Sequence, residues 1–179
     1  MNIESVINMI ESKEYEYFIV KYQSETDFLK HIYKFPDLKD SSDCSVKALV
    51  LPCKNKHKNI ELQFNEINGE YVFVEMLFGD FCFEMYDCPE EILLNEIMRV
   101  IYQVFSDLIA IIVQNDIKNK KWIGDDCYYL IEDDPVFGEP GFFNALRRIQ
   151  RPQNPFEKMF SNKREYEIYS YSSYQSIIK

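Results

Sequence analysis

Residues 60–86 hold the most restrictive pattern of the chain, because two tight-turn signals separate three strand-like runs. Apolar and polar residues alternate over Ile60–Asn65, which is the period of a strand buried on one face only. Asn68-Gly69 predicts a two-residue hairpin turn, since both positions of that turn take positive φ. With Gly79-Asp80 as the second turn, the segment predicts a three-strand antiparallel meander.

Helical patterns flank this meander. Apolar residues from Leu93 to Leu108 recur at helical spacing behind Pro89, which predicts a long amphipathic helix on one face of the sheet. Ile3–Ile10 and Phe28–Phe35 show the same spacing over shorter lengths, and Ser24 is placed to cap the second of these helices. Additional strands are expected at Tyr15–Tyr22, Val46–Leu51, Ile109–Val113, Lys121–Ile131 and Glu165–Tyr171.

Strands that cluster together, with helices on one face, are typical of the α+β class. We therefore predict an antiparallel sheet with a central three-strand meander, one long amphipathic helix packed on one face and additional short helices. The chain has 179 residues, which is within the size of one domain.

Charge divides this single domain into two parts. The formal net charge is −10, yet residues 144–179 carry 7 Lys/Arg against 3 Asp/Glu. We predict an acidic α+β core over residues 1–134 and a basic, Tyr-rich C-terminal extension over residues 135–179, packed on that core. An acidic protein repels nucleic-acid phosphates and anionic membranes, and it attracts basic proteins. The expected partner is therefore a basic protein, with no nucleic acid and no membrane.

Cysteine usage and hydropathy indicate a cytoplasmic location. The five Cys include no C-x-x-C pair, which is typical of free thiols in a reducing compartment. The N-terminal residues lack the basic start and apolar core of a signal peptide. The longest apolar run, Leu108–Val113, is far shorter than the roughly 20 residues that a membrane span needs.

Catalytic motifs are missing from the sequence. The two histidines, His31 and His57, are both predicted to lie at the surface, and neither belongs to an H-E-x-x-H zinc motif. The nucleophile motif G-x-S-x-G and both glycine-rich phosphate-binding loops are absent. We predict no catalytic residue, no metal ligand and no cofactor.

Acidic residues cluster around one strand-like run near the C-terminal third. Their neighbours Trp122 and Tyr128 are residue types that dominate protein interfaces. The plainest interpretation is a solvated acidic rim, and the functional one is a surface that offers a basic protein both charge and aromatic anchors. The predicted partner-binding residues are Trp122, Asp125, Asp126, Tyr128, Glu132, Asp133 and Asp134.

Three functions remain open on this basis. The first is a non-enzymatic protein-binding module for a basic partner, of which an immunity or antitoxin inhibitor is one form. The second is a carboxylate-based enzyme, including a metal-dependent one, that works through the same acidic clusters. The third is a structural or scaffold subunit that forms a homodimer through a sheet edge or through the Tyr-rich tail.

Overall fold

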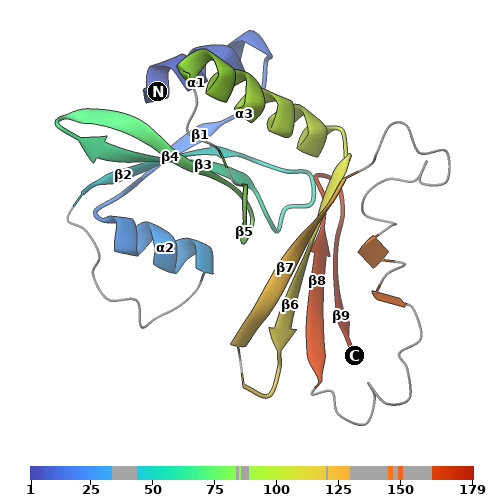
Figure 1. The fold of residues 1–179 in the computed structure, drawn as a ribbon. Coiled ribbons are helices and arrows are strands. Elements are labelled where there is room, and N and C mark those ends of the chain that lie inside the picture. The colour runs from blue at the N-terminus through green and yellow to red at the C-terminus, as the bar shows by residue number, and fades with distance from the viewer. Residues whose placement is uncertain are drawn as a thin grey trace. The chain divides into compact units, whose positions relative to one another are not determined.

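The computed structural model describes residues 1–33, 44–83, 85, 89–119, 121–129, 145–146, 149–150 and 163–179. In this part of the chain the fold is α+β, with two antiparallel sheets and three helices (Figure 1). The predicted α+β class is confirmed, while the strands divide between two sheets rather than joining one. None of the helices within these ranges is long and apolar enough to cross a bilayer.

The chain forms two compact units, Met1–Ile101 and Tyr102–Lys179. The first unit carries 10 Lys/Arg against 19 Asp/Glu, a net charge of −9. The second carries 10 Lys/Arg against 11 Asp/Glu, a net charge of −1. The predicted division into an acidic core and a basic extension at residue 134 stays a prediction.

The sheet of the first unit has five antiparallel strands in the order β1-β2-β3-β4-β5 (Figure 1). Each strand pairs with the next one along the chain, so every connection within the sheet joins neighbours. The strands are β1 (Phe18–Tyr22), β2 (Val46–Leu51), β3 (Ile60–Ile67), β4 (Glu70–Phe78) and β5 (Phe81–Phe83). The β3–β4 turn has positive φ at Asn68 (54°) and Gly69 (86°), as that dipeptide predicts.

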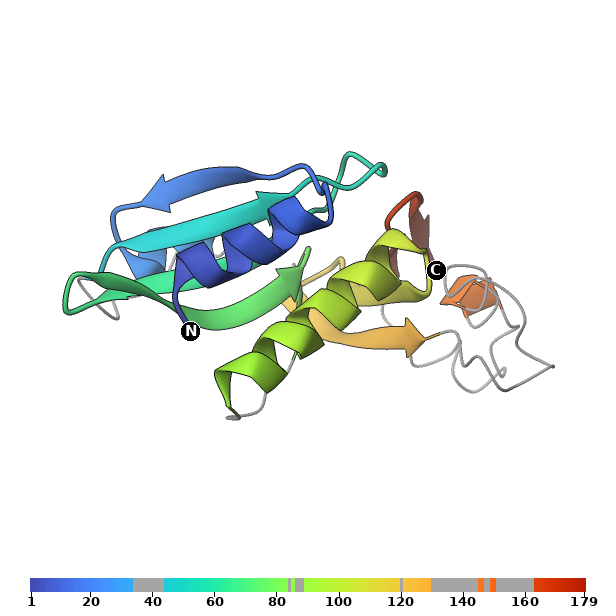
Figure 2. The ribbon, with the colours of Figure 1, turned by 90° about the horizontal axis from the view of Figure 1, so that it is seen from above.

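Helices α1 (Ile3–Ser12) and α3 (Glu90–Phe105) lie on one face of this sheet (Figures 1 and 2). In α1 the Asn2 side chain caps the first turn by accepting a hydrogen bond from the Ser5 backbone N–H at 2.9 Å. The sheet side chains on the face that α1 and α3 cover form a fully buried core. It includes Leu49, Leu51, Ile60, Leu62, Phe64, Met76 and Phe78.

Helix α2 (Glu25–Tyr33) lies on the opposite face (Figure 1). The Ser24 hydroxyl accepts a hydrogen bond from the Asp27 N–H at 3.2 Å, which confirms the predicted cap. Phe28 and Ile32 of α2 form a core with side chains of β2 and β4, namely Val46, Ala48, Val50 and Leu77. The sheet is therefore covered on both faces.

Coverage by α2 overturns one expectation about β3. The alternation over Ile60–Asn65 predicts a strand with its polar side in water, yet Glu61 is only 7% exposed and Gln63 only 1%. By the β2–β3 register, Glu61 lies opposite Val50 and Gln63 opposite Ala48, both of which belong to the α2 core. The strand is thus buried on both faces, and its polar face is part of the interior.

The sheet of the second unit has four antiparallel strands in the order β7-β6-β8-β9 (Figure 1). They are β6 (Ile109–Asp116), β7 (Lys121–Tyr129), β8 (Arg164–Tyr169) and β9 (Tyr174–Ile178). The single terminal strand expected at Glu165–Tyr171 is in fact a hairpin of two strands. Asp107 holds its turn, since its Oδ1 accepts hydrogen bonds from the Ser170 hydroxyl (2.8 Å) and the Ser172 N–H (2.9 Å).

One face of this second sheet carries an apolar cluster. Ala145 and Ile149 pack there with Ala110, Ile112 and Ile168. Residues 145–146 and 149–150 are helical. The register of the strands therefore places alternate residues, including Ile111 and Val113, on the other face.

Candidate functional site

The sequence-predicted site falls mainly on β7, an edge strand of the second sheet. Trp122 is 47% exposed, Asp125 is half-buried and Asp126 is exposed. Tyr128 lies on the same strand, where its backbone pairs with Ala110. The remaining predicted residues, Glu132, Asp133 and Asp134, lie outside the described residues.

Asp125 and Asp126 point to opposite faces of the sheet. Asp125 lies opposite Val113 in the β6–β7 register, whereas Asp126 lies opposite Ile112. Consecutive strand residues alternate between faces, so these two carboxylates cannot bind one ion together. The described part of the chain contains no group of three or more His, Cys, Asp or Glu residues that could hold a metal ion.

A β-bulge shapes the exposed end of β7. The register shifts between Gln114 and Asn115, which pair with Gly124 and Trp122 and leave Ile123 between them as the extra residue. Ile123 is 43% exposed. A bulge offsets the alternation of an edge strand, so it places Trp122 on the same face as Asp125, three residues further along the strand.

The structure brings two further carboxylates to the face that holds Trp122 and Asp125. In one row across the sheet, Trp122 (β7) lies opposite Asn115 (β6), which lies opposite Glu165 (β8). In the next row of this face, Asp125 lies opposite Val113, which lies opposite Glu167. We name this surface the acidic face, and it comprises Trp122, Asp125, Glu165, Glu167 and Tyr174.

Strand β9 positions the carboxylates of β8. The Ser176 hydroxyl donates a hydrogen bond to Glu165 Oε1 at 2.8 Å. The Tyr174 hydroxyl donates one to Glu167 Oε2 at 3.2 Å. Each of these carboxylates therefore has a hydroxyl that holds it in place on the sheet, and both glutamates stay half-exposed.

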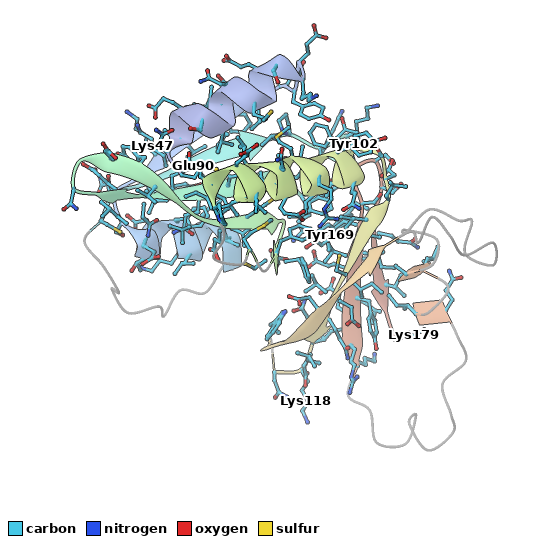
Figure 3. All side chains as sticks on the ribbon, turned by 45° about the horizontal axis from the view of Figure 1, so that its top comes forward. Lys47, Glu90, Tyr102, Lys118, Tyr169 and Lys179 are labelled. Atoms are coloured by element: carbon cyan, nitrogen blue, oxygen red, sulfur yellow. The ribbon has the colours of Figure 1, made fainter. Side chains whose placement is uncertain are left out.

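Some basic residues in the described part of the second unit lie away from the acidic face. Arg164 and Lys179 have the strand parity of the opposite, apolar face, and the Lys179 ammonium donates a hydrogen bond to the Ile149 carbonyl there. Lys118 lies at the tip of the β6–β7 hairpin (Figure 3). Of the five carboxylates on the described strands of this sheet, Asp125, Glu165 and Glu167 thus lie on the acidic face, and Asp116 and Asp126 have the parity of the opposite face.

Sequence reasoning missed Glu165, Glu167 and Tyr174 as members of this surface. A local signal exists, because Glu165 and Glu167 alternate with Tyr166 and Ile168, which places both glutamates on one side of a strand. Their approach to Asp125 depends on β6 pairing with both β7 and β8. The β6–β8 pairing joins residues 48 (Asp116 and Arg164) to 58 (Ile111 and Tyr169) positions apart in the chain, and no local pattern encodes it.

A second polar cluster lies between α2 and the sheet of the first unit. The Glu25 carboxylate accepts hydrogen bonds from Gln63 Nε2 (3.4 Å) and Asn65 Nδ2 (3.2 Å). Gln63 Nε2 also donates to Asn65 Oδ1 at 2.7 Å. Glu75 lies opposite Gln63 on β4, and its carboxylate accepts a hydrogen bond from the Cys82 thiol at 3.3 Å.

Burial changes the titration of this cluster. Removal from water raises the pKa of Glu61, and the nearby His31 imidazole opposes that rise. Burial likewise raises the pKa of Glu75; the Cys82 thiol opposes this, and the Glu25 charge adds to it. Burial and the Glu61 charge together raise the pKa of Tyr22 to about 12. All three groups therefore favour their protonated forms more than they would in water.

Both histidines lie at the surface, as predicted, and His31 lies beside the buried carboxyl of Glu61. Its Nε2 is 3.7 Å from Glu61 Oε1, which is an ion-pair distance when the imidazole is protonated and is too long for a hydrogen bond. The His31 ring also lies 5.6 Å from the Tyr22 ring, centroid to centroid. His57 is exposed, while Cys53, four residues before it, is buried.

Comparison of the chain with protein-family models, with curated proteins and with solved structures gave no match in any of the three.

Proposed function

We propose that this protein is a non-enzymatic binding module for a basic protein partner, and that the acidic face is the surface it uses. An inhibitor of the immunity or antitoxin kind is one form of such a module. The observation that carries the proposal is the gathering of Asp125, Glu165 and Glu167 with Trp122 and Tyr174 on one face of one sheet.

The spacing of these carboxylates suits an extended basic segment. Glu165 and Glu167 are two residues apart on β8, so their Cα atoms are about 6.6–6.8 Å apart. Alternate side chains of an extended peptide have the same spacing. Asp125 lies two strands from Glu167, about 10 Å away. The acidic face can therefore also contact basic side chains that are spread over a broader surface.

Aromatic anchors and long-range charge add to this arrangement. Trp122, at 47% exposed, is a residue type that supplies much of the binding energy at interfaces. The net charge of −10 attracts a basic partner before contact and speeds association at low ionic strength.

The test is capture of basic proteins from a lysate of the cells in which the protein occurs, with the wild-type chain and two variants as bait. We expect the wild type to retain a basic protein at low salt and to release it as salt rises. Trp122→Ala should weaken binding of that protein by about 2 kcal/mol, or roughly thirtyfold in Kd. The triple variant Asp125→Asn/Glu165→Gln/Glu167→Gln should abolish retention.

A triple variant of equal charge change, Glu14→Gln/Glu16→Gln/Glu70→Gln, is the matched control. All three of its positions are exposed and lie in the first unit. It should retain the partner almost as well as the wild type does. Equal loss of binding in both triple variants would show that only overall charge matters and would refute a role for the acidic face.

A further inference from the structure

Two buried side-chain oxygens in the first unit have no hydrogen-bond partner among the residues that the structure describes. They are Glu61 Oε2 and Gln63 Oε1, both on β3 and both facing α2. Glu61 is 7% exposed and Gln63 only 1%, so water offers them little compensation. A buried acceptor without a donor costs free energy, and the large majority of buried polar groups in proteins are paired.

The surroundings of these two oxygens are rich in acceptors. Glu25 is already the acceptor for the Gln63 and Asn65 amides, and Glu75 is already the acceptor for the Cys82 thiol. Three carboxylates therefore surround Gln63. When these carboxyls are ionised, the described residues offer the two oxygens no donor, and a donor that carries positive charge would satisfy the oxygens and balance the carboxylates together.

The position of the two oxygens limits the shape of that donor. Glu61 and Gln63 are alternate residues of one strand, about 6.6–6.8 Å apart at Cα. A planar guanidinium presents five N–H donors in a fixed fork and can reach two acceptors at once, whereas an ammonium is a compact point charge. The Tyr22 ring lies near the same cluster, since its centroid is 5.6 Å from that of His31, whose Nε2 is 3.7 Å from Glu61 Oε1.

We infer that the polar cluster of Glu25, Glu61, Gln63 and Glu75 is a binding site for a guanidinium group. The inferred bonds run from guanidinium N–H groups to Glu61 Oε2 and Gln63 Oε1. The guanidinium comes either from a free small molecule or from an arginine side chain of a protein. This site lies in the first unit, so it is separate from the acidic face and independent of the proposed function.

The test is an NMR titration of the full, ¹⁵N-labelled chain with two probes of matched alkyl chain, butylguanidinium and butylammonium. We expect saturable shifts at the Glu61 and Gln63 backbone amides and at the Gln63 side-chain amide with butylguanidinium. Butylammonium should bind at least roughly tenfold more weakly, because it cannot span both acceptors. Absence of saturable shifts with butylguanidinium would overturn the inference.

Three variants locate the site. Glu61→Gln removes the negative charge and one of the two carboxylate oxygens, and Gln63→Met removes the amide acceptor; each should weaken butylguanidinium binding by roughly tenfold or more. The second variant keeps the test valid if the first does not fold. Glu70→Gln, an exposed carboxylate on the neighbouring strand β4, should leave binding unchanged. Equal affinity in all three variants would overturn the inference.

A blocked tripeptide with central arginine distinguishes the two sources of the guanidinium. Binding as tight as that of butylguanidinium, with the same dependence on Glu61 and Gln63, identifies a protein arginine as the ligand that fits. Much weaker binding of the peptide identifies a free small molecule. Both results support the site, and they are independent of any effect of variants in the acidic face.

Discussion

At the scale of single residues, Glu61 shows how position on a strand decides the properties of a side chain. Its strand is covered by α2, so a carboxyl that the alternation places in water lies in the interior. One oxygen faces His31 at 3.7 Å, and the other has no partner. Such a group destabilises the fold when ionised and is well placed for a cationic ligand.

Glu61→Gln should therefore stabilise the ligand-free protein at neutral pH, by about 1 kcal/mol. The pKa of Glu61 is raised by burial, so the folded state binds the proton more tightly than the unfolded state does. The free energy of unfolding consequently falls as pH rises above the ordinary value of 4.5. Urea denaturation at about pH 5 and about pH 7 should show a smaller fall in the variant than in the wild type.

Glu70→Gln controls for the loss of one negative charge, because Glu70 is exposed. It should keep the pH dependence of the wild type. If Glu61→Gln has an unchanged pH dependence as well, then Glu61 ionises in the folded state without cost and the description of it as a destabilising buried carboxyl is wrong.

At the scale of elements, α2 depends for its stability on packing against the sheet of the first unit. It has 9 residues, fewer than an isolated helix needs for stability in water. Its attachment to the sheet runs through Phe28 and Ile32, which are buried against β2 and β4. The same packing encloses the polar cluster, so the helix that stabilises the first unit also defines the inferred guanidinium site.

Phe28→Ala should cost about 3–4 kcal/mol of the free energy of unfolding, because it leaves a cavity beneath α2. Ile67→Ala, at a position that is 51% exposed, should cost no more than about 1 kcal/mol. Urea denaturation of the two variants compares them directly. Similar losses in both would mean that α2 adds little to the stability of the first unit.

Local signals in the sequence predict much of the fold at this scale. The Ser24 cap and the positive φ of Asn68 and Gly69 are both present, because each depends on only a few neighbouring residues. Burial of Glu61 was not predictable, since it depends on α2 covering a strand more than 25 residues further along the chain. The alternation of a strand shows which residues share a face, and it does not show what covers that face.

In the candidate site, too, local patterns in the sequence predict some features, and the pairing of distant strands decides others. Trp122 and Asp125 lie on one face of β7 only because the bulge at Ile123 offsets their odd spacing, while Asp126 points to the other face. Glu165 and Glu167 join them only because β6 pairs with strands on both sides. Composition indicated an acidic interaction surface, and the pairing of distant strands decides which carboxylates belong to it.

At the scale of the whole chain, charge is distributed unequally. The first unit carries a net −9 and the second a net −1. The first unit therefore dominates the long-range attraction of a basic partner. The proposed contact surface lies in the nearly neutral second unit, where Asp125, Glu165 and Glu167 share one face of the sheet. Long-range attraction and specific contact are thus properties of different parts of the chain.

Hydrogen exchange of the protein alone and in complex with the captured basic partner tests the proposed function most directly. We predict that the partner slows exchange in β7 and β8, over 121–129 and 164–169, and that the acidic-face triple variant loses this protection. Slower exchange confined to the first unit, with β7 and β8 unchanged, would contradict the assignment of the acidic face as the binding surface.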